Sequence, residues 1–588
     1  MHSNPSTCVA FDADGRLYSS GYDGYIVAWN DTLTGARWRT RHEGLANCLC
    51  LCGDVIASVG ADRILRMWEI ETGKPVRSKN SIQTDDLNSA RFLVGHNAIV
   101  ASTDDGRVLM FSLHNSELQW SATSGPPDVY GESIESISLV GADGDPKILF
   151  ADGSGRVGIL DVNGRLEQSG NFGAVVDCCI ANQDKGIAYL GLDTGEILSL
   201  ELDGLKPIRK AEAHAATVKS MALNSDGLVA SASYDGRLKL WTPDLEPLRD
   251  ICLSTVDRHA WARGIAFHPE TKHMLACTSL GSNPVLIDTR SESAIVATHS
   301  STHGINSIDV RHARVVLGCD DGRVWFGNAT TVSPRVDLES MVLVVKVHPF
   351  EFFGAAGTQD GHLVLFDLSI GQIVFLHDNG GVPVISLCYS ADGRSLNFGD
   401  YNGGLWRLNL ASRHVERVTT VAAAIKSLCQ IEESSYFAVA VADGSVSVID
   451  SNAGGCIQST NSEVFLPNAL SWSSAMNCLI SVSRDLAVRR WTKELALIHT
   501  DVGHTRSVKS LALSPDQRTW ATGSYDSTIK IWDENGEIAT CIGHDWPGVP
   551  ALCWVDDNML ASGGWDGTLR FWSRQGVPIT TVKLASHS

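Results

Sequence analysis

The chain has 588 residues, of which 44% are hydrophobic and 19% are charged, and 67 acidic against 47 basic residues give a net charge of −20. This length exceeds what one hydrophobic core usually supports and suits two domains of about 300 residues. The negative charge argues against tracking of nucleic-acid phosphates, which needs a basic stripe, and slightly favours a basic protein or peptide as partner.

One hairpin unit recurs along the whole chain. It reads Asp-Gly, four residues and then a large apolar residue, as in Asp23-Gly24 before Trp29. Asp-Gly between short alternating apolar runs signals a tight hairpin, because the turn needs a positive φ that glycine adopts without penalty. In chain order, the aligned apolar position holds Trp29, Trp68, Phe111, Leu160, Leu200, Trp241, Ile287, Gly327, Phe366, Leu408, Ile449, Trp491, Trp532 and Trp572.

Each repeat is long enough for four short strands. In the repeat from His214 to Leu248 we expect strands at 217–223, 228–233 and 238–241 and a fourth near Pro247. Four antiparallel strands form a blade that cannot bury both faces alone, so blades must pack in rings. The chain should therefore be an all-β protein.

The most complete repeat carries a recognisable motif. Gly503-His504 is followed nine residues later by Leu513, then by Tyr525-Asp526 and by Trp532-Asp533. In order, spacing and period the chain resembles WD40-repeat β-propellers along nearly its whole length. The repeats around Leu160, Leu200, Ile287, Gly327 and Ile449 are degenerate but keep the register.

Propellers close with about four to eight blades, so fourteen repeats imply two tandem rings. Seven plus seven blades is the symmetric solution, with propellers at 1–300 and 301–588 and a junction at 298–304; six plus eight is the alternative. The chain starts at the loop before an innermost strand and ends after an outer one. We therefore expect no stapling strand at the seam, although a crossover of a terminal strand or blade stays open.

Several repeats combine His, Ser or Thr, and Asp, which are also the components of a hydrolytic triad. One protein does not need that triad five times. The resemblance instead implies a structural network in which the turn Asp, loop His, strand hydroxyl and strand Trp hydrogen-bond to one another. The sets are His42, Ser58, Asp62 and Trp68; His214, Ser231, Asp235 and Trp241; His504, Thr522, Asp526 and Trp532; His544, Ser562, Asp566 and Trp572; and His2, Ser19, Asp23 and Trp29.

The fifteen cysteines are scattered over the expected strands. Cys48, Cys50 and Cys52 alternate along one strand, but neither a second cluster nor a nearby His pair completes a zinc site. We expect these cysteines to pack as small apolar residues in a reducing compartment, and we expect neither a metal nor a cofactor.

The resemblance also indicates where partners dock. In WD40 propellers the Asp turns and His loops open on one rim of the ring, and the residue before the turn Asp should be exposed there. Aromatic and Arg side chains are enriched at binding hot spots, although here they could simply pack on a neighbouring loop. The candidate partner-binding residues are Tyr22, Tyr234, Arg258, Trp261 and Arg263 in the first ring and Arg484, Tyr525, Trp546 and Trp565 in the second.

These features predict a non-catalytic scaffold that presents two propeller rims to proteins in a multiprotein assembly. A cytoskeletal factor similar to actin-interacting proteins, which share the two-ring architecture, is an alternative. A sensor or regulatory subunit of a larger signalling complex is another, and an enzyme would show polar groups with perturbed pKa inside one ring. No run approaches the 18 apolar residues of a membrane span and the N-terminus lacks the parts of a signal peptide, so we expect a cytoplasmic location. The sequence leaves the oligomeric state open.

Overall fold

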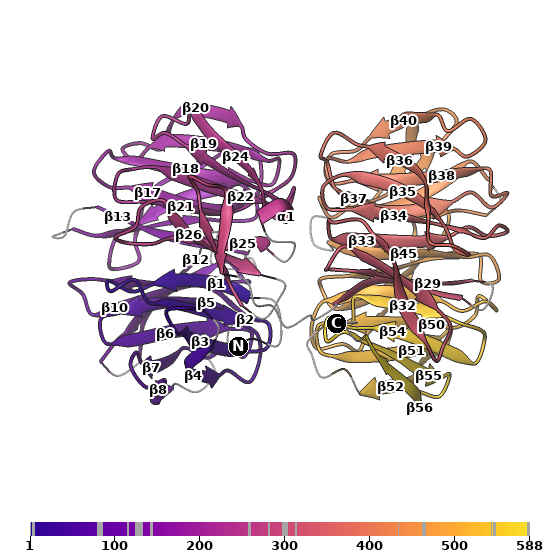
Figure 1. Ribbon diagram of the computed structural model, residues 1–588, viewed down its shortest axis with the longest axis horizontal. Coiled ribbons are helices and arrows are strands. Elements are labelled where there is room, and N and C mark those ends of the chain that lie inside the picture. The colour runs from indigo at the N-terminus through magenta and orange to yellow at the C-terminus, as the bar shows by residue number, and fades with distance from the viewer. Residues whose placement is uncertain are drawn as a thin grey trace. The chain divides into compact units, whose positions relative to one another are not determined.

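The computed structural model describes residues 2, 6–33, 35–78, 86–114, 117–123, 133–141, 145–256, 260–279, 283–296, 304–311, 314–432, 434–460, 466–542, 544 and 548–584. Over these residues the chain forms fourteen four-stranded antiparallel sheets and one short helix (Figure 1). The prediction of an all-β, propeller-like architecture is confirmed. No helix in the described ranges is long and apolar enough to cross a membrane.

The chain divides into two compact units, Met1–Ser300 and Ser301–Ser588. In the first unit the elements are, sheet by sheet, β1 Ser6–Phe11, β2 Leu17–Gly21, β3 Tyr25–Trp29 and β4 Ala36–Arg41; β5 Ala46–Cys52, β6 Val55–Gly60, β7 Arg66–Glu69 and β8 Pro75–Ser78; β9 Leu87–Leu93, β10 Ala98–Thr103, β11 Arg107–Ser112 and β12 Leu118–Thr123; β13 Ser136–Val140, β14 Lys147–Ala151, β15 Arg156–Leu160 and β16 Leu166–Asn171; β17 Val176–Asn182, β18 Ile187–Leu192, β19 Glu196–Glu201 and β20 Lys206–Glu212; β21 Val218–Leu223, β22 Val229–Ser233, β23 Arg237–Trp241 and β24 Pro247–Cys252; then α1 Leu253–Val256, followed by β25 Ala260–Phe267, β26 Met274–Ser279, β27 Val285–Asp288 and β28 Ser293–Val296.

The second unit repeats this plan. Its strands are β29 Ile305–Arg311, β30 Arg314–Cys319, β31 Arg323–Gly327 and β32 Val332–Asp337; β33 Val342–Val347, β34 Phe353–Thr358, β35 His362–Asp367 and β36 Ile373–Asp378; β37 Val384–Tyr389, β38 Ser395–Asp400, β39 Gly404–Asn409 and β40 Val415–Thr420; β41 Ile425–Gln430, β42 Tyr436–Val441, β43 Val446–Asp450 and β44 Gly455–Ser459; β45 Pro467–Ser473, β46 Cys478–Ser483, β47 Ala487–Trp491 and β48 Leu497–Val502; β49 Val508–Leu513, β50 Trp520–Ser524, β51 Thr528–Asp533 and β52 Gly536–Ile542; and β53 Ala551–Trp554, β54 Met559–Gly563, β55 Thr568–Ser573 and β56 Pro578–Lys583.

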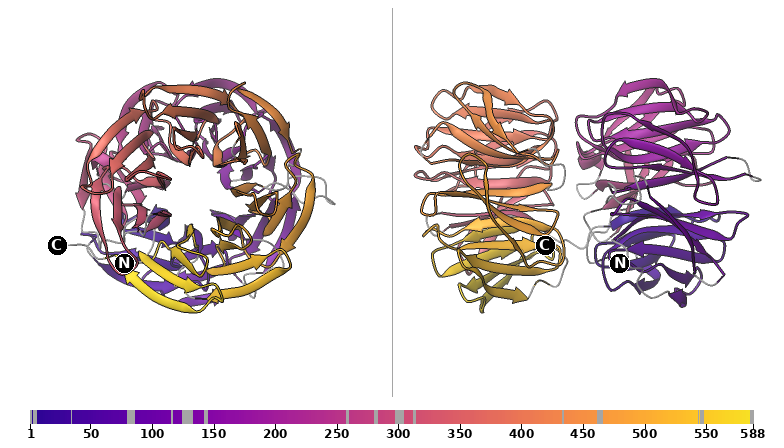
Figure 2. Two further views of the ribbon diagram at one scale, coloured as in Figure 1. Left: turned by 90° about the vertical axis from the view of Figure 1, so that its right-hand side faces the viewer. Right: turned by 180° about the vertical axis from the view of Figure 1, so that it is seen from behind.

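Burial is deepest in the second strand of a sheet and lowest in the fourth. The second strand is buried along its whole length in β10 and β22, whereas the fourth strand alternates exposed and half-buried side chains in β4 and β12. This gradient matches a blade whose first strand faces the ring axis and whose last strand faces solvent. Figure 2 shows the sheets of the second unit arranged in this way around an open axis.

Neighbouring sheets pack face to face, and the last sheet of each unit meets the first. In the first unit Val9 and Trp29 pack with Ala276, and the backbone N–H of Ser279 donates to Ser6 Oγ over 2.8 Å. In the second unit Ile305 lies in one apolar cluster with Phe571, and its N–H donates to the carbonyl of Gly564 over 3.1 Å. In the described residues each sheet contains four strands that are consecutive in the chain, so side-chain packing and isolated hydrogen bonds close each seam.

Candidate interaction surfaces

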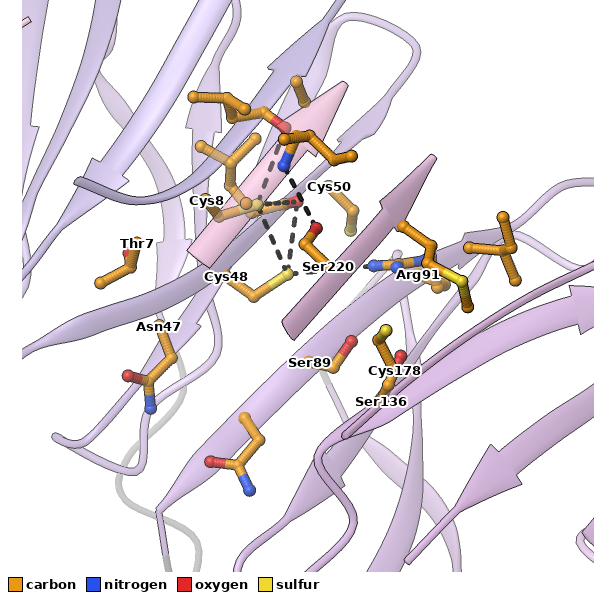
Figure 3. Close-up of a pocket in the computed structure, with 18 of the residues that line it drawn as sticks. Thr7, Cys8, Asn47, Cys48, Cys50, Ser89, Arg91, Ser136, Cys178 and Ser220 are labelled. Atoms are coloured by element: carbon orange, nitrogen blue, oxygen red, sulfur yellow. Dashed lines mark hydrogen bonds between the residues drawn. The ribbon is translucent and has the colours of Figure 1, made fainter. Parts of the chain in front are cut away.

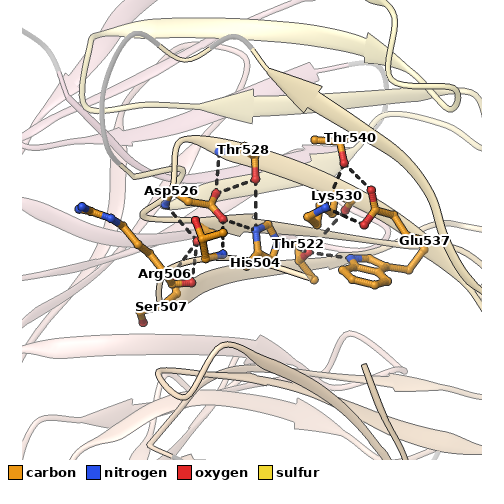
Figure 4. A network of polar contacts seen from close by, with 12 residues as sticks. His504, Arg506, Ser507, Thr522, Asp526, Thr528, Lys530, Glu537 and Thr540 are labelled. Carbon is orange, nitrogen blue, oxygen red and sulfur yellow. Dashed lines mark hydrogen bonds and ion pairs between the residues drawn. The ribbon is translucent and has the colours of Figure 1, made fainter. Parts of the chain in front are cut away.

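The expected hydrogen-bonded network is present in the most complete repeat (Figure 4). His504 Nδ1 lies 2.9 Å from Asp526 Oδ2, and His504 Nε2 lies 2.8 Å from Thr522 Oγ1. Trp532 Nε1 donates to the same hydroxyl oxygen over 2.8 Å. The four side chains therefore connect the second strand, the third strand, the turn and the preceding loop of one sheet.

The other four sets adopt the same arrangement. His Nε2 lies 2.6 to 2.8 Å from the Ser hydroxyl, and the Trp indole donates to that hydroxyl over 2.8 Å in each. His Nδ1 lies 3.0, 2.9 and 3.0 Å from the carboxylate of Asp23, Asp62 and Asp235, and 3.5 Å from that of Asp566. The last contact is the loosest of the five.

These triads cannot act as nucleophiles in this conformation. Ser58, Ser231, Thr522 and Ser562 are fully buried, and each hydroxyl oxygen already accepts from a Trp indole. A reacting hydroxyl would need access to a substrate, and burial denies it here. The arrangement serves to hold the hairpin.

The turn aspartates are stabilised as carboxylates. Burial alone would raise the pKa of Asp62, Asp235, Asp526 and Asp566, but the hydrogen bond and charge of the paired histidine together with further hydrogen bonds outweigh it, and the pKa of each is lowered. Bonds from the turn add to this effect, since Asp526 also accepts from the Thr528 hydroxyl over 2.6 Å. The charged form is therefore part of the folded structure.

A feature that the sequence analysis missed lies at the start of the first strands. A β-bulge breaks the pairing of the first and second strands, so that one residue leaves the ladder and its side chain is redirected. We call these the bulge residues: Thr7, Asn47, Asn88, Asp177 and Lys219 in the first unit, and Asn306, Leu343, Ile385, Lys426, Asn468 and Lys509 in the second.

The amide bulge residues link neighbouring sheets. Asn47 Nδ2 donates to the carbonyl of Leu87 over 2.9 Å, and Asn468 Nδ2 donates to that of Val508 over 2.8 Å. Each acceptor is the residue just before the bulge of the next sheet. A polar residue directly after the first apolar residue of an inner strand, as in Val218-Lys219, is the sequence signal for this position.

In the first unit the charged bulge residues Lys219 and Asp177 pair with each other beside the predicted rim residue Tyr234. Lys219 forms an ion pair with Asp177, and its Nζ lies 3.9 Å from Glu135 and 6.0 Å from the centre of the Tyr234 ring. Burial alone would lower the pKa of Lys219. The negative charges of Asp177 and Glu135 raise it by more than this, so the pKa of Lys219 lies well above its ordinary value. Lys219 is a firmly charged centre of this cluster.

The same cluster extends to the seam. The guanidinium of Arg263 lies 5.2 Å from the centre of the Tyr22 ring, which joins the seventh sheet to the first. The expectation that Tyr22 is exposed is wrong, because its side chain is 9% exposed and packs with Leu45 and Ala61 of the next sheet.

In the second unit the predicted aromatic residues are half-buried packing partners. The rings of Tyr525 and Trp565 lie 5.8 Å apart at 45°, and Trp565 Nε1 donates to Asn306 Oδ1 over 2.9 Å. Arg484 is exposed, as expected of a rim residue. Arg258 and Trp546 lie outside the described residues, as does the side chain of Trp261.

A basic group accompanies Arg484. Lys426 Nζ lies 3.4 Å from Asn468 Oδ1, and within the described residues no carboxylate forms an ion pair with it. Burial, and then the positive charges of Lys509 and Arg484, lower the pKa of Lys426 to about 7. The second unit therefore brings together three basic side chains, Lys426, Arg484 and Lys509, in a chain whose net charge is −20, and the ammonium of Lys426 is only partly protonated at neutral pH.

The first strands of all seven sheets of the first unit also line a polar cavity of about 480 Å³ (Figure 3). Its wall includes Cys8, Cys48, Arg91 and Cys178 together with the charged bulge residues. In the described part of the chain no three His, Cys, Asp or Glu side chains gather as a metal site would require.

Comparisons with known proteins agree with this architecture. The model "WD domain, G-beta repeat" matches residues 205–242, 495–533 and 535–573, and the model "Outer membrane protein assembly factor BamB" matches residues 2–184. The chain is 32% identical over 19% of its length to mouse "F-box-like/WD repeat-containing protein TBL1X" and 34% identical over 14% to "U3 small nucleolar RNA-associated protein 13" of Saccharomyces cerevisiae. It spans only 23% and 11% of those two proteins. "Ribosome biogenesis protein YTM1" of Eremothecium gossypii is 23% identical over 56% of this chain and 77% of its own length.

Proposed function

The chain is a WD40-repeat protein, and we propose that it is a non-catalytic scaffold whose two units, 1–300 and 301–588, are separate propellers that bind proteins at the rims that carry their bulge residues. The bulge residues support this most directly. Where the bulge residue is Thr or Asn, its side chain joins neighbouring sheets, and Lys426 also reaches the next sheet through Asn468. Burial and then repulsion from Lys509 and Arg484 lower the pKa of Lys426, and an acidic partner would offset this cost of the charged form.

The charge pattern assigns a kind of partner to the second unit. Lys426, Lys509 and the exposed Arg484 together favour an acidic segment of a protein. This differs from the basic partner that the net charge favours. In the first unit Lys219 is already neutralised by Asp177 and Glu135, so the same attraction is absent there.

The test compares a double variant of two bulge lysines with a variant of a lysine on an outer strand. The double variant Lys426→Met and Lys509→Met removes two charges at similar side-chain volume, and Lys583→Met removes an exposed charge on the outer strand β56. Affinity purification from the native host with mass spectrometry should identify proteins that the wild type and Lys583→Met retain and the double variant loses. Cross-linked partner peptides should be acidic, and binding should weaken as salt rises.

The double variant should have the same melting temperature as the wild type, which shows that the substitutions leave the fold intact. If the full set of partners survives in the double variant, the second unit does not bind proteins through these lysines. Loss of the same partners in Lys583→Met would show a nonspecific effect of charge and would also refute the proposal.

A further inference from the structure

Two cysteines of the first unit face each other across neighbouring sheets. Cys8 lies on β1 and Cys48 on β5, and their Sγ atoms are 3.9 Å apart in the wall of the cavity (Figure 3). Each is the residue that directly follows the bulge residue of its strand. The same position in successive repeats therefore brings the two thiols together.

Other side chains at this position behave differently. Cys178 donates to the backbone carbonyl of Val218 in the next sheet over 3.2 Å, and Ser386 and Ser510 make the same contact to Ile425 and Val549 over 2.7 and 2.6 Å. For Cys8 the corresponding acceptor is the carbonyl of Ala46, but the hydroxyl of Thr7 already donates to it. Cys8 Sγ instead lies 3.9 Å from Cys48 Sγ and at the same distance from the carbonyl oxygens of Val9 and Leu49.

A cation lies beside this pair. Arg91 Nη1 is 3.9 Å from Cys48 Sγ and donates to the carbonyl of Ala90 over 2.8 Å, and among the described residues it has no carboxylate partner. A guanidinium stays charged at any pH of interest, so it favours a thiolate at Cys48.

The two thiols differ in acidity. The hydrogen bond from Cys8 lowers the pKa of Cys48 to about 6, helped by Arg91 and opposed by burial, whereas the pKa of Cys8 is raised well above its ordinary value by the same bond and by burial. At neutral pH the pair is a thiolate next to a thiol. This is the combination of an attacking and a resolving cysteine.

We propose that Cys48 and Cys8 form an oxidation site for hydrogen peroxide that enters the cavity. The Cys48 thiolate attacks one peroxide oxygen, the O–O bond breaks, and a sulfenic acid and hydroxide form; the hydroxide takes a proton and becomes water. The Cys8 thiol then attacks the sulfenic sulfur, a disulfide forms and a second water leaves. Two electrons pass from the two sulfur atoms to the peroxide.

The disulfide between Cys8 and Cys48 would connect β1 and β5, the first strands of the first two sheets. The sulfur atoms must approach from 3.9 Å to about 2.05 Å, which requires side-chain rotation or a small shift of one strand. The oxidised pair would also remove the negative charge next to Arg91 and leave that guanidinium facing the cavity.

A second cysteine pair in the same unit provides a matched control. Cys50 and Cys52 lie on one strand with their Sγ atoms 3.8 Å apart, but the pKa of Cys50 is raised well above its ordinary value by its bond to Cys52 and by burial. Among the described residues no guanidinium hydrogen-bonds to either sulfur of this pair, as Arg91 does to Cys48, so proximity alone should not give rapid oxidation.

The experiment uses the reduced full-length chain. A few equivalents of hydrogen peroxide at pH 7 should give a Cys8–Cys48 disulfide in peptide mass spectrometry under non-reducing conditions. Cys8→Ser should instead accumulate a sulfenic acid at Cys48 that a 1,3-diketone probe traps, Cys48→Ser should abolish the product, and Cys50→Ser should leave it unchanged. Arg91→Met should slow the reaction several-fold.

A second measurement uses only the wild type, so its result does not depend on whether the variants fold. Alkylation of the fifteen cysteines by iodoacetamide between pH 5 and 8, read by mass spectrometry, should label Cys48 faster at pH 6 to 7 than Cys50 and Cys178, which are about equally buried. The proposal is overturned if Cys48 reacts no faster than Cys50 or Cys178. It is also overturned if peroxide joins Cys50 to Cys52 before it joins Cys8 to Cys48.

Discussion

Asp526→Ala tests whether the hydrogen-bonded network contributes to stability. The Asp526 carboxylate accepts from His504 Nδ1 over 2.9 Å and from the backbone N–H groups of Thr505 and Thr528 over 2.9 Å each, as well as from the Thr528 hydroxyl. Alanine removes all four acceptor contacts. Thr505 is exposed, so water can replace its bond, but His504 is buried.

The expected loss follows from the groups that stay buried. An unsatisfied buried polar group costs about 1–3 kcal/mol, and the weakened turn adds about 1 kcal/mol. We expect Asp526→Ala to lower the free energy of unfolding by about 2–4 kcal/mol. For a unit of this size that corresponds to a fall in melting temperature of about 3–7 °C.

Asp443→Ala is the matched control in the same unit. Asp443 is exposed and accepts only from the backbone and side chain of Ser445, over 2.9 and 2.7 Å. Its repeat has Ile449 in place of Trp and lacks the paired histidine. We expect a loss of about 0.5 kcal/mol, because surface substitutions rarely exceed that.

Scanning calorimetry of both variants measures the two losses in stability. Because both residues lie in the second unit, they report on the same unfolding transition. Equal losses in the two variants would refute the argument that the complete network holds its sheet more firmly than a degenerate turn.

Two further predictions concern charge. The pKa of Asp62, Asp235, Asp526 and Asp566 is lower in the folded chain than the value of about 3.9 in an unfolded one, so their contribution is present above that value and is lost as pH falls below it. Melting temperature should therefore fall between about pH 5 and pH 3, and a constant value would contradict this. Lys219→Met leaves Asp177 and Glu135 without their ammonium partner and should destabilise the first unit by up to roughly 3 kcal/mol in urea unfolding. Adding Asp177→Asn should recover part of that loss, and strictly additive losses would show that the pair is not coupled.

The repeat made the strands predictable almost residue by residue. For the repeat that starts at His214, the expected strands at 217–223, 228–233 and 238–241 correspond to β21 Val218–Leu223, β22 Val229–Ser233 and β23 Arg237–Trp241. Period, turn chemistry and apolar alternation all point to the same four strands, which is why local sequence was sufficient. The degenerate repeats form sheets as well, because burial of a second strand does not depend on the His–Asp contact.

Surface exposure could not be predicted in the same way. The position before the turn Asp places Tyr22 on a rim, but the adjacent sheet supplies Leu45 and Ala61 to cover it. Trp565 is likewise held by Asn306, a residue 259 positions away in the chain. Motif position identifies the element that carries a side chain, whereas exposure depends on the neighbouring blade.

The bulges explain why the net charge of the chain says little about its partners. A bulge residue leaves the ladder, so its identity is not fixed by strand pairing, and Asn, Asp, Lys, Leu and Ile all occur at this position. Charge can therefore accumulate on part of one rim, as at Lys426 and Lys509, while acidic residues elsewhere set the total. Because Debye screening limits exposed charges to about 8–10 Å in physiological salt, a docking segment responds to the side chains beside it and not to the sum over 588 residues. On the surface proposed for the second unit, we therefore expect the nearby basic side chains to matter more for the choice of partner than the net charge of −20.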